Sequence, residues 1–152
     1  VHKSTVALFM AEVLYRLVKE SERNEALFDF VWGSVEALDA LDEGTANFHL
    51  WFLAQLSRLL GFAPGNDYAE GDWFDVREGR YTPRPPRQPP CLTQEEARTL
   101  AQLLGCDVRA LGALSLDRRR RVEFLDAMLA YYGYHLDAMG AVQSLHVLRE
   151  VF

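Results

Sequence analysis

The stretch LLGFAPGNDYAEGDWFDVREGRYTPRPPRQPPCLTQEEARTLAQLL, residues 59–104, decides how this chain folds. The helix that leads into it stops at Gly61, because glycine readily adopts the left-handed conformation that closes a helix C-terminus. Pro64 then prevents the helix from resuming. Further on, Thr93 is followed three residues later by Glu96, and this capping box predicts the start of another helix. The residues between the two helices therefore form a separate, non-helical module.

Within this module the sequence predicts a short β-hairpin and a proline-rich arm. Residues 73–76 and 80–82 are rich in aromatic and β-branched side chains, and they flank a turn at Glu78-Gly79. Five of the six prolines of the chain then fall within residues 83–90. This composition predicts a stiff, polyproline-like arm rather than a strand or a helix. The arm could dock in a groove of its own protein or, as a loose PxxP match, present a ligand.

A hairpin of this size cannot bury a core of its own, so something must hold it to the rest of the protein. Proteins commonly use a metal or disulfides for this purpose, but the module has no CxxC pair. We therefore expect no metal and no other cofactor. Instead, packing of apolar side chains on the helices should hold the hairpin, through Trp73, Phe74, Val76 and Tyr81.

Periodic apolar residues predict helices on both sides of the module. The first half of the second helix has little polar face, so we expect that half to be buried on several sides. The third helix is apolar almost all round and should lie at the centre. The expected helices cover residues 6–18, 24–41 (capped by Asn24), 46–60 and 93–104, one that Ser115 caps, and 144–152, with a short helical turn from Asp107. These features predict a mainly α fold, a helical bundle with a small inserted β-hairpin.

Charge and composition limit the classes of function. The net charge is −6, and it is concentrated in residues 1–72, which carry 5 Lys/Arg against 12 Asp/Glu. Residues 73–152 carry 11 against 10. The chain as a whole is therefore not a general binder of phosphate backbones. Cys91 and Cys106 suggest reduced thiols, and no apolar run is long enough to span a bilayer, so we expect a cytoplasmic protein without membrane contact.

Two local groups of arginines remain candidates for binding nucleic acid or another anion. One group surrounds the hairpin and consists of Arg77, Arg80, Arg84 and Arg87. The other consists of Arg109 and the run Arg118, Arg119, Arg120 and Arg121. Four successive helical residues fan out around the axis, and the helix dipole disfavours cations in a first turn. Either the run grips an anion together with free backbone N–H groups, or it pairs with the acidic first half of the chain.

Signatures of catalysis are missing from the sequence. It has no HExxH, no GxSxG and no phosphate-binding glycine loop. His49 lies within the apolar third helix and is expected to be a core residue. A helical hydrolase that uses His49 with Asp39 or Asp42 would require an open cleft shared by these groups. We therefore expect no enzyme.

Three tyrosines near the end of the fifth helix leave two readings open. Tyr131, Tyr132 and Tyr134 could stack on bases of a nucleic acid. At this spacing, however, their rings are better suited to the core and to helix packing, and we favour that structural role.

Five segments, in order and in register, resemble the C-terminal region of the bacterial DNA repair family RecO. They are HKSTVALFMAEVLYRLV (2–18), LFDFVWGSVEAL (27–38), ANFHLWFLAQLSRLLGFAP (46–64), FDVREGRY (74–81) and SLHVLREVF (144–152). The resemblance covers nearly all of residues 1–152 and implies one helical domain with residues 62–91 as an insertion. It also implies that an N-terminal OB-fold, which precedes this region in the family, is absent from this chain.

The resemblance further implies a recombination mediator rather than an enzyme. Such a protein binds single- and double-stranded DNA, anneals strands, and works with RecR to load RecA onto DNA coated by single-strand-binding protein, whose acidic tail it contacts. It would act in the cytoplasm, at the nucleoid. Many members carry a four-cysteine zinc site at the hairpin, but this chain has only Cys91 there, so no metal is expected. No family motif fixes the positions of the arginines. The alternative is a protein-interaction scaffold that does not touch nucleic acid.

Overall fold

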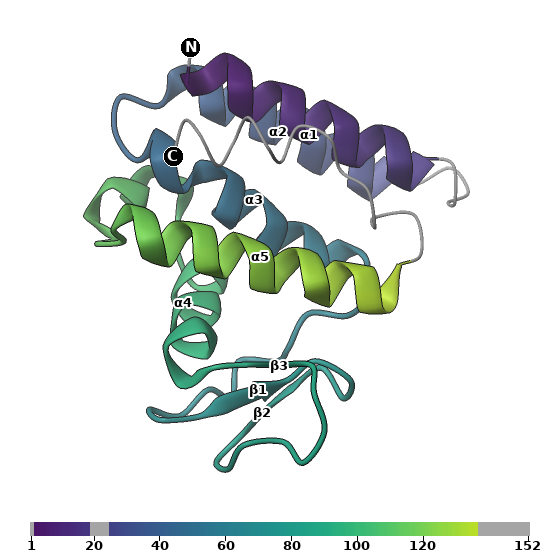
Figure 1. Cartoon of the computed structure of the whole chain (residues 1–152). Helices are drawn as coiled ribbons and strands as arrows, with labels where there is room; N and C mark the ends of the chain where they lie inside the picture. Colours follow the sequence, from purple (N-terminus) through teal and green to yellow (C-terminus); the bar gives the residue numbers. More distant parts are fainter. Residues whose placement is uncertain (1, 19–24, 137–152) are drawn as a thin grey trace.

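The computed structural model describes residues 2–18 and 25–136, which form a mainly helical body with a small antiparallel sheet at one end (Figure 1). The predicted fold class is confirmed. The predicted Asn24 cap and the helix over residues 144–152 lie outside the described residues. In chain order the elements are α1 (His2–Val18), α2 (Glu25–Ala40), α3 (Thr45–Leu59), β1 (Trp73–Asp75), β2 (Arg80–Thr82), β3 (Cys91–Leu92), α4 (Gln94–Leu104), the 3-10 helix η1 (Val108–Ala113) and α5 (Arg118–His135).

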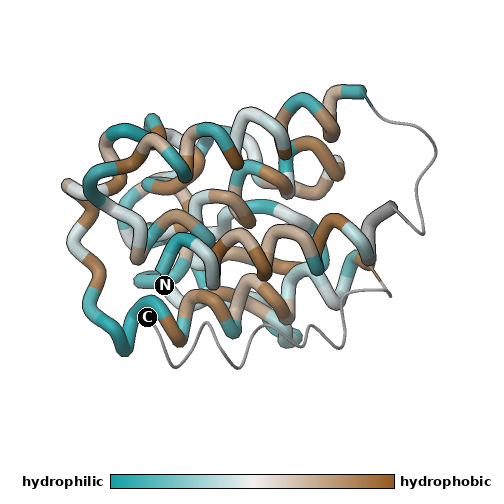
Figure 2. Tube along the Cα trace, turned by 90° about the horizontal axis from the view of Figure 1, so that it is seen from above, coloured by the Kyte–Doolittle hydropathy of each residue, from teal (hydrophilic) through white to brown (hydrophobic). Residues whose placement is uncertain are grey.

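Helix α3 lies at the centre of the helical body, as its apolar composition predicts. It contacts α1, α2, α4, η1 and α5, so side chains on almost every side of it are buried. Phe48, Leu50 and Phe52 have no exposed surface at all. Seen from above in Figure 2, hydrophobic and hydrophilic residues alternate along the trace of the helices, as expected for helices with one apolar side.

The prediction that the first half of α2 is buried on several sides is wrong. Only Leu27, Ser34 and Leu38 of this helix are buried, whereas Phe28 and Trp32 are exposed. The reason is the position of α2 in the outer layer, where it packs on α3 and α1 through a single stripe. Apolar composition alone does not reveal how many neighbours a helix has.

The predicted hairpin is confirmed, and a third strand completes its sheet in the order β2-β1-β3. Phe74 of the central strand pairs with Tyr81 of β2 and Leu92 of β3, both antiparallel. Gly79 closes the hairpin with a φ of 65°, a conformation that glycine adopts without strain. Strand β3 was not predicted, because two residues after a proline-rich arm carry no periodic signal.

Buried aromatic and aliphatic side chains hold the sheet to the helices. Phe74, Val76 and Tyr81 are buried, and the Phe74 ring lies edge-on to Tyr131 of α5, with 5.2 Å between ring centroids. Trp73, also expected to hold the hairpin, is half-buried and lines a cleft together with Glu96 of α4 and Phe124 of α5. Side chains alternate along a strand, so Phe74 points into the core while Trp73 lies on the other face of the sheet, where it is less completely buried.

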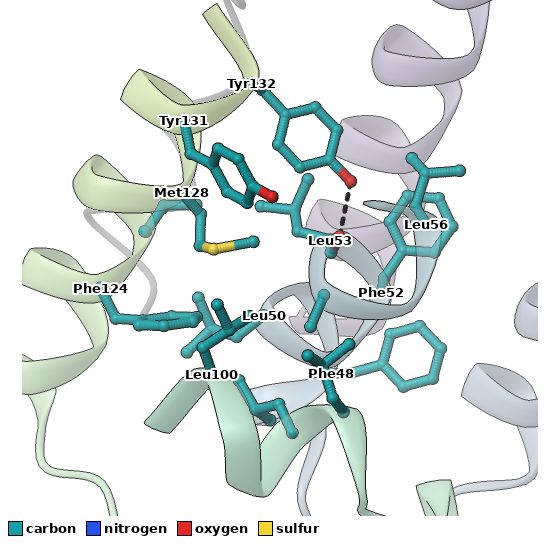
Figure 3. Close-up of a cluster of buried hydrophobic side chains, with 14 of the residues drawn as sticks. Phe48, Leu50, Phe52, Leu53, Leu56, Leu100, Phe124, Met128, Tyr131 and Tyr132 are labelled. Atoms are coloured by element: carbon teal, nitrogen blue, oxygen red, sulfur yellow. Dashed lines mark hydrogen bonds between the residues drawn. The ribbon is translucent and has the colours of Figure 1, made fainter. Parts of the chain in front are cut away.

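Two tyrosines of α5 lie against α3 (Figure 3), and one of them also connects α5 to Phe62 at the start of the sheet module. The Tyr132 hydroxyl donates to the Leu53 carbonyl at 2.5 Å, and the Tyr131 hydroxyl donates to the Phe62 carbonyl. The Phe62 ring contacts both tyrosine rings, with centroids about 5 Å away. Both tyrosines are fully buried, which agrees with the structural role favoured for them.

The helix caps agree with the sequence in two cases and differ in one. Thr93 accepts from the Glu96 backbone N–H at 3.2 Å, and Gly61 adopts a φ of 86° after α3, both as predicted. Helix α5, however, is capped by Asp117 and not by Ser115. The Asp117 carboxylate accepts from the Arg120 N–H at 2.8 Å, which is the bond expected three residues into a helix. Ser115 lies two residues too early to make it.

Replacing Phe74 should destabilise the protein more than replacing Trp73. We expect Phe74→Ala to lower the free energy of unfolding by about 3–5 kcal/mol, since it removes a fully buried ring and leaves a cavity. Trp73→Ala should cost less, about 2 kcal/mol, because part of its ring surface is already exposed. Urea denaturation of both variants and the wild type measures the difference. A larger loss for Trp73→Ala would contradict this account of how the sheet is anchored.

The free energy of unfolding should also decrease as the pH is lowered, because of His49. This ring is buried in α3, and burial, helped by the positive charge of Arg121, lowers its pKa from 6.5 to about 3. Between these values the unfolded chain binds a proton that the folded chain does not, so stability falls as pH decreases. We expect a contribution of about 2 kcal/mol between pH 7 and pH 5.

Denaturation curves at both pH values test this prediction. His49→Leu should remove about that much of the pH dependence, whereas His2→Gln, a change at an exposed histidine, should not. An equal pH dependence in the wild type and His49→Leu would show that His49 is not the group responsible.

Candidate nucleic-acid interface

The four arginines around the hairpin, here called the arm arginines, all lie exposed on the sheet module. Arg77 is in the hairpin turn, Arg80 begins β2, and Arg84 and Arg87 lie in the proline-rich arm. The module lies at the opposite end of the molecule from α1 and α2 (Figure 1). The arm arginines are thus separated from the carboxylates of α1 and α2, although the sheet module has carboxylates of its own, such as Asp67 and Glu78.

Arg77 connects the turn, the arm and the end of α5. Its Nε donates to the Pro89 carbonyl at 3.2 Å, which ties the returning arm to the hairpin. Its guanidinium also lies 5.8 Å from the centroid of the Tyr134 ring, within the range of a cation–π contact. Tyr134 is 47% exposed and lies edge-on to His135, whose Nε2 is 2.8 Å from the Val76 carbonyl.

The cluster of Arg77 and Tyr134 was not predicted as a unit. The two residues are 57 positions apart, and no local pattern links a hairpin turn to the last turn of a helix. Tyr134 differs from Tyr131 and Tyr132 because it points away from the core. An exposed aromatic ring beside an arginine is the combination on which an unpaired base can stack.

The run Arg118–Arg121 does not form a single patch. Arg119 pairs with Glu123 at 3.1 Å, one turn further along α5, and Arg120 pairs with Glu95 of α4 at 2.5 Å. Arg121 donates to the Leu116 carbonyl at 2.5 Å. Each of these three side chains therefore has a separate partner, as the fan-like arrangement of successive helical residues requires.

The carboxylates that pair with Arg109, Arg119 and Arg120 lie in the second half of the chain. The alternative prediction placed the partners of the run in the acidic first half, so this detail is wrong for Arg119 and Arg120. Arg109 pairs with Asp107 at 3.2 Å, and hydrogen bonds from Arg109 lower the pKa of that exposed carboxyl. These pairs form because sequence neighbours and the adjoining helix are closer than α1 or α2.

The N-terminus of α5 is also less open to an anion than its sequence suggests. The Asp117 carboxylate accepts from the Arg120 backbone N–H, and this bond, more than the nearby arginines, lowers its pKa. A bound phosphate would have to compete with this carboxylate for the same donors. In contrast, no carboxylate of the described residues forms an ion pair with an arm arginine.

An open cleft of about 710 Å³ lies between α4, the loop before α5 and the loop at Tyr68–Gly71. Its charged lining residues are Glu70, Glu95, Arg98 and Arg120. Arg120 is held by Glu95, which leaves Arg98 as the cation of this cleft that forms no ion pair within the described residues. The mixed polar lining suits a peptide or an ion better than an apolar small molecule.

The residues considered for catalysis do not come together. His49 is 1% exposed inside the body, while Asp39 and Asp42 are exposed at the end of α2, so they share no open cleft. The two thiols are not activated nucleophiles either, because burial raises the pKa of both Cys91 and Cys106.

The residues around the hairpin do not fit a zinc ion. Asp72 accepts from the Ala69 N–H at 3.0 Å, and Asp75 accepts from the N–H groups of Arg77 and Glu78 at 2.9 and 3.1 Å. These carboxylates stabilise the turns directly, as Asx turns do. Across residues 2–18 and 25–136, no three His, Cys, Asp or Glu side chains are grouped so that they could hold a metal.

Comparison with known proteins shows the relationships of the chain. The sequence profile of the family described as "Recombination protein O C terminal" matches residues 1–141. A protein named DNA repair protein RecO from Bacteroides fragilis is 38% identical over 99% of this chain. Proteins with the same name from Phocaeicola vulgatus and Flavobacterium psychrophilum are 36% and 34% identical, again over 99% of the chain.

The chain spans 62–63% of the length of these three relatives. The search of solved structures found no match. No helix within the described residues is both long enough and apolar enough to cross a membrane.

Removing metal should leave stability unchanged, because the turns of the sheet module are held by carboxylates and buried rings rather than by a cluster of metal ligands. We expect the same melting temperature, within about 1 °C, before and after extensive dialysis against a chelator. Added Zn²⁺ should not raise it. A fall of several degrees on chelation that zinc reverses would contradict this prediction.

Proposed function

The chain belongs to the RecO family, and from this premise we propose that it acts in DNA repair and homologous recombination by binding, with no chemistry of its own. The names of its relatives support the repair role. The absence of a catalytic arrangement among the groups described above is consistent with binding alone. In a full-length protein this region would be the helical domain, with residues 62–91 as an insertion and an OB-fold preceding it.

The observation that carries the nucleic-acid part of the proposal is the set of exposed arm arginines beside Tyr134. Their guanidinium groups form no ion pair with a carboxylate of the described residues, so they remain available to phosphates. The Tyr134 ring offers a partly exposed face for a base, next to Arg77. Such a surface suits single-stranded DNA, in which bases are free to stack. Double-stranded DNA would engage the arginines but not the ring.

We assign a smaller role to Arg109 and Arg118–Arg121. Arg109, Arg119 and Arg120 already pair with carboxylates of their own chain, so binding a phosphate would first break those pairs. Exposed pairs of this kind are weak, so the arginines add a diffuse positive charge near α4 rather than a specific contact.

Protein partners complete the proposal. Single-strand-binding protein, through its acidic tail, and RecR would be held near DNA by the same domain, which would favour annealing and the loading of RecA at the nucleoid. The cleft lined by Arg98 and Arg120 has suitable chemistry for an acidic peptide.

The second candidate, a scaffold that touches no nucleic acid, is favoured by the net charge of −6 and by the internal pairing of the α5 arginines.

Binding of a fluorescent single-stranded oligonucleotide at several salt concentrations tests the proposal. A triple Ala variant of Arg80, Arg84 and Arg87 should bind at least about tenfold more weakly at low salt. Its plot of log affinity against log salt should become shallower by about 2, since each lost phosphate contact contributes about 0.7. Arg77 is left in place because it also holds the arm.

The matched control is a triple Ala variant of Arg109, Arg118 and Arg119, which changes the net charge by the same amount. We expect it to retain most of the affinity. Equal losses in both variants would mean that net charge alone matters. No binding by the wild type at low salt would favour the scaffold.

Tyr134→Ala should weaken binding to single strands more than to duplex, while Tyr134→Phe should not.

A further inference from the structure

Helix α2 exposes an unusual row of large apolar side chains. Phe28, Trp32 and Val35 expose 66%, 60% and 43% of their surface. Spaced by four and three residues, they form one stripe along the helix. The opposite side packs on the body through Leu27 and Leu38. A stripe of this kind is uncommon on the free surface of a protein and usually marks a contact with another molecule.

Carboxylates lie on the same side of the helix as this stripe. At 100° per residue, Glu25, Asp29, Glu36 and Asp39 all fall within about 60° of Trp32 around the axis. No lysine or arginine occurs in residues 25–40. Glu25, Phe28, Asp29, Trp32, Val35, Glu36 and Asp39 together form what we call the acidic α2 face.

One hydrogen bond orders the middle of the acidic α2 face. The Trp32 Nε1 donates to the Glu36 carboxylate at 2.9 Å, which fixes the indole against the helix. At the C-terminal end, the Lys3 ammonium of α1 donates to the Asp39 backbone carbonyl at 2.7 Å. This bond does not involve the Asp39 carboxylate. A ligand would therefore meet a preformed aromatic surface bordered by negative charge.

We propose that the acidic α2 face binds a cationic amphipathic helix of a partner protein. Apolar side chains of that helix would cover Phe28, Trp32 and Val35, as in other helix–helix contacts. Its lysines or arginines would pair with Asp29, Glu36 and Asp39, and one of them could lie over the Trp32 ring. Charge complementarity selects this occupant over nucleic acid, whose phosphates the carboxylates repel.

The position of the face is consistent with simultaneous binding of two ligands. α2 and the sheet module lie at opposite ends of the molecule (Figure 1). A helix on α2 would therefore not block the arm arginines. Because the two surfaces share no residue, loss of one binding activity in a variant need not affect the other.

Binding of designed peptides tests the inference. The probe is a labelled 16-residue helical peptide with leucine at one-face positions and lysine elsewhere, and its counterpart has glutamate in place of lysine. We expect the wild type to bind the lysine peptide at least about tenfold more tightly than the glutamate peptide, with an affinity that falls as salt increases. Equal binding of the two peptides, or binding of neither, would overturn the inference.

Surface variants locate the site. Phe28→Ser with Trp32→Ser should weaken binding of the lysine peptide at least about tenfold, as should Asp29→Lys with Glu36→Lys. Because these side chains are exposed, we expect circular dichroism to show unchanged helicity. The controls are Tyr134→Ser for the aromatic change and Glu70→Lys with Glu78→Lys for the charge change, and both should bind like the wild type. Unchanged affinity in the α2 variants would show that the peptide does not bind on α2.

Two further results would assign the face to another occupant and overturn the inference. One is self-association in sedimentation experiments that depends on Trp32 and that the lysine peptide does not reverse. The other is competition by a peptide that carries residues 141–152, which would make the chain's own C-terminal segment the ligand. If neither occurs, and the lysine peptide alone binds in a Trp32-dependent way, the face is a docking surface for a cationic partner helix.

Discussion

The structure depends on the contact of Phe62 with the end of α5. This residue lies just after α3, and its carbonyl accepts the Tyr131 hydroxyl while its ring packs on Tyr131, Tyr132 and His135. Phe74 of the sheet touches the same Tyr131 ring. One aromatic cluster therefore joins the central helix, the last described helix and the sheet module. A module too small to fold alone becomes part of the body through this cluster.

The same attachment explains how charge is distributed in space. It places the arm arginines and Tyr134 at one end, while the carboxylates and aromatic rings of α2 lie at the other. A net charge of −6 would argue against DNA binding if charge were spread evenly. Charges more than a Debye length apart, about 10 Å at moderate salt, are largely screened from each other, so the carboxylates of α2 have little effect on the arm arginines. The nearer carboxylates of the sheet module, such as Asp67 and Glu78, do share their surroundings. The chemistry of each end, rather than the total charge, decides what it can bind.

The sequence predicts those features whose cause is local. Gly61, the Thr93 cap and the hairpin turn each follow from a few adjacent residues, and all three are confirmed. Features that depend on distant parts of the chain could not be predicted. A periodic pattern cannot tell which of Trp73 and Phe74 faces the core, how many neighbours cover α2, or that Arg77 meets Tyr134. The two-residue strand β3 likewise exists only because β1 is already present to pair with it.

The proline-rich arm connects the two outer strands of the sheet, β2 and β3. Strands at the rim of a sheet carry unpaired backbone groups, which can recruit a strand from another molecule and start aggregation. Proline has no backbone N–H that could donate a hydrogen bond to such an incoming strand. Five prolines in the connection therefore keep this segment from pairing as a further strand of the sheet. The connection between the two rim strands thus adds no extended, hydrogen-bonding backbone of its own to the edge of the sheet.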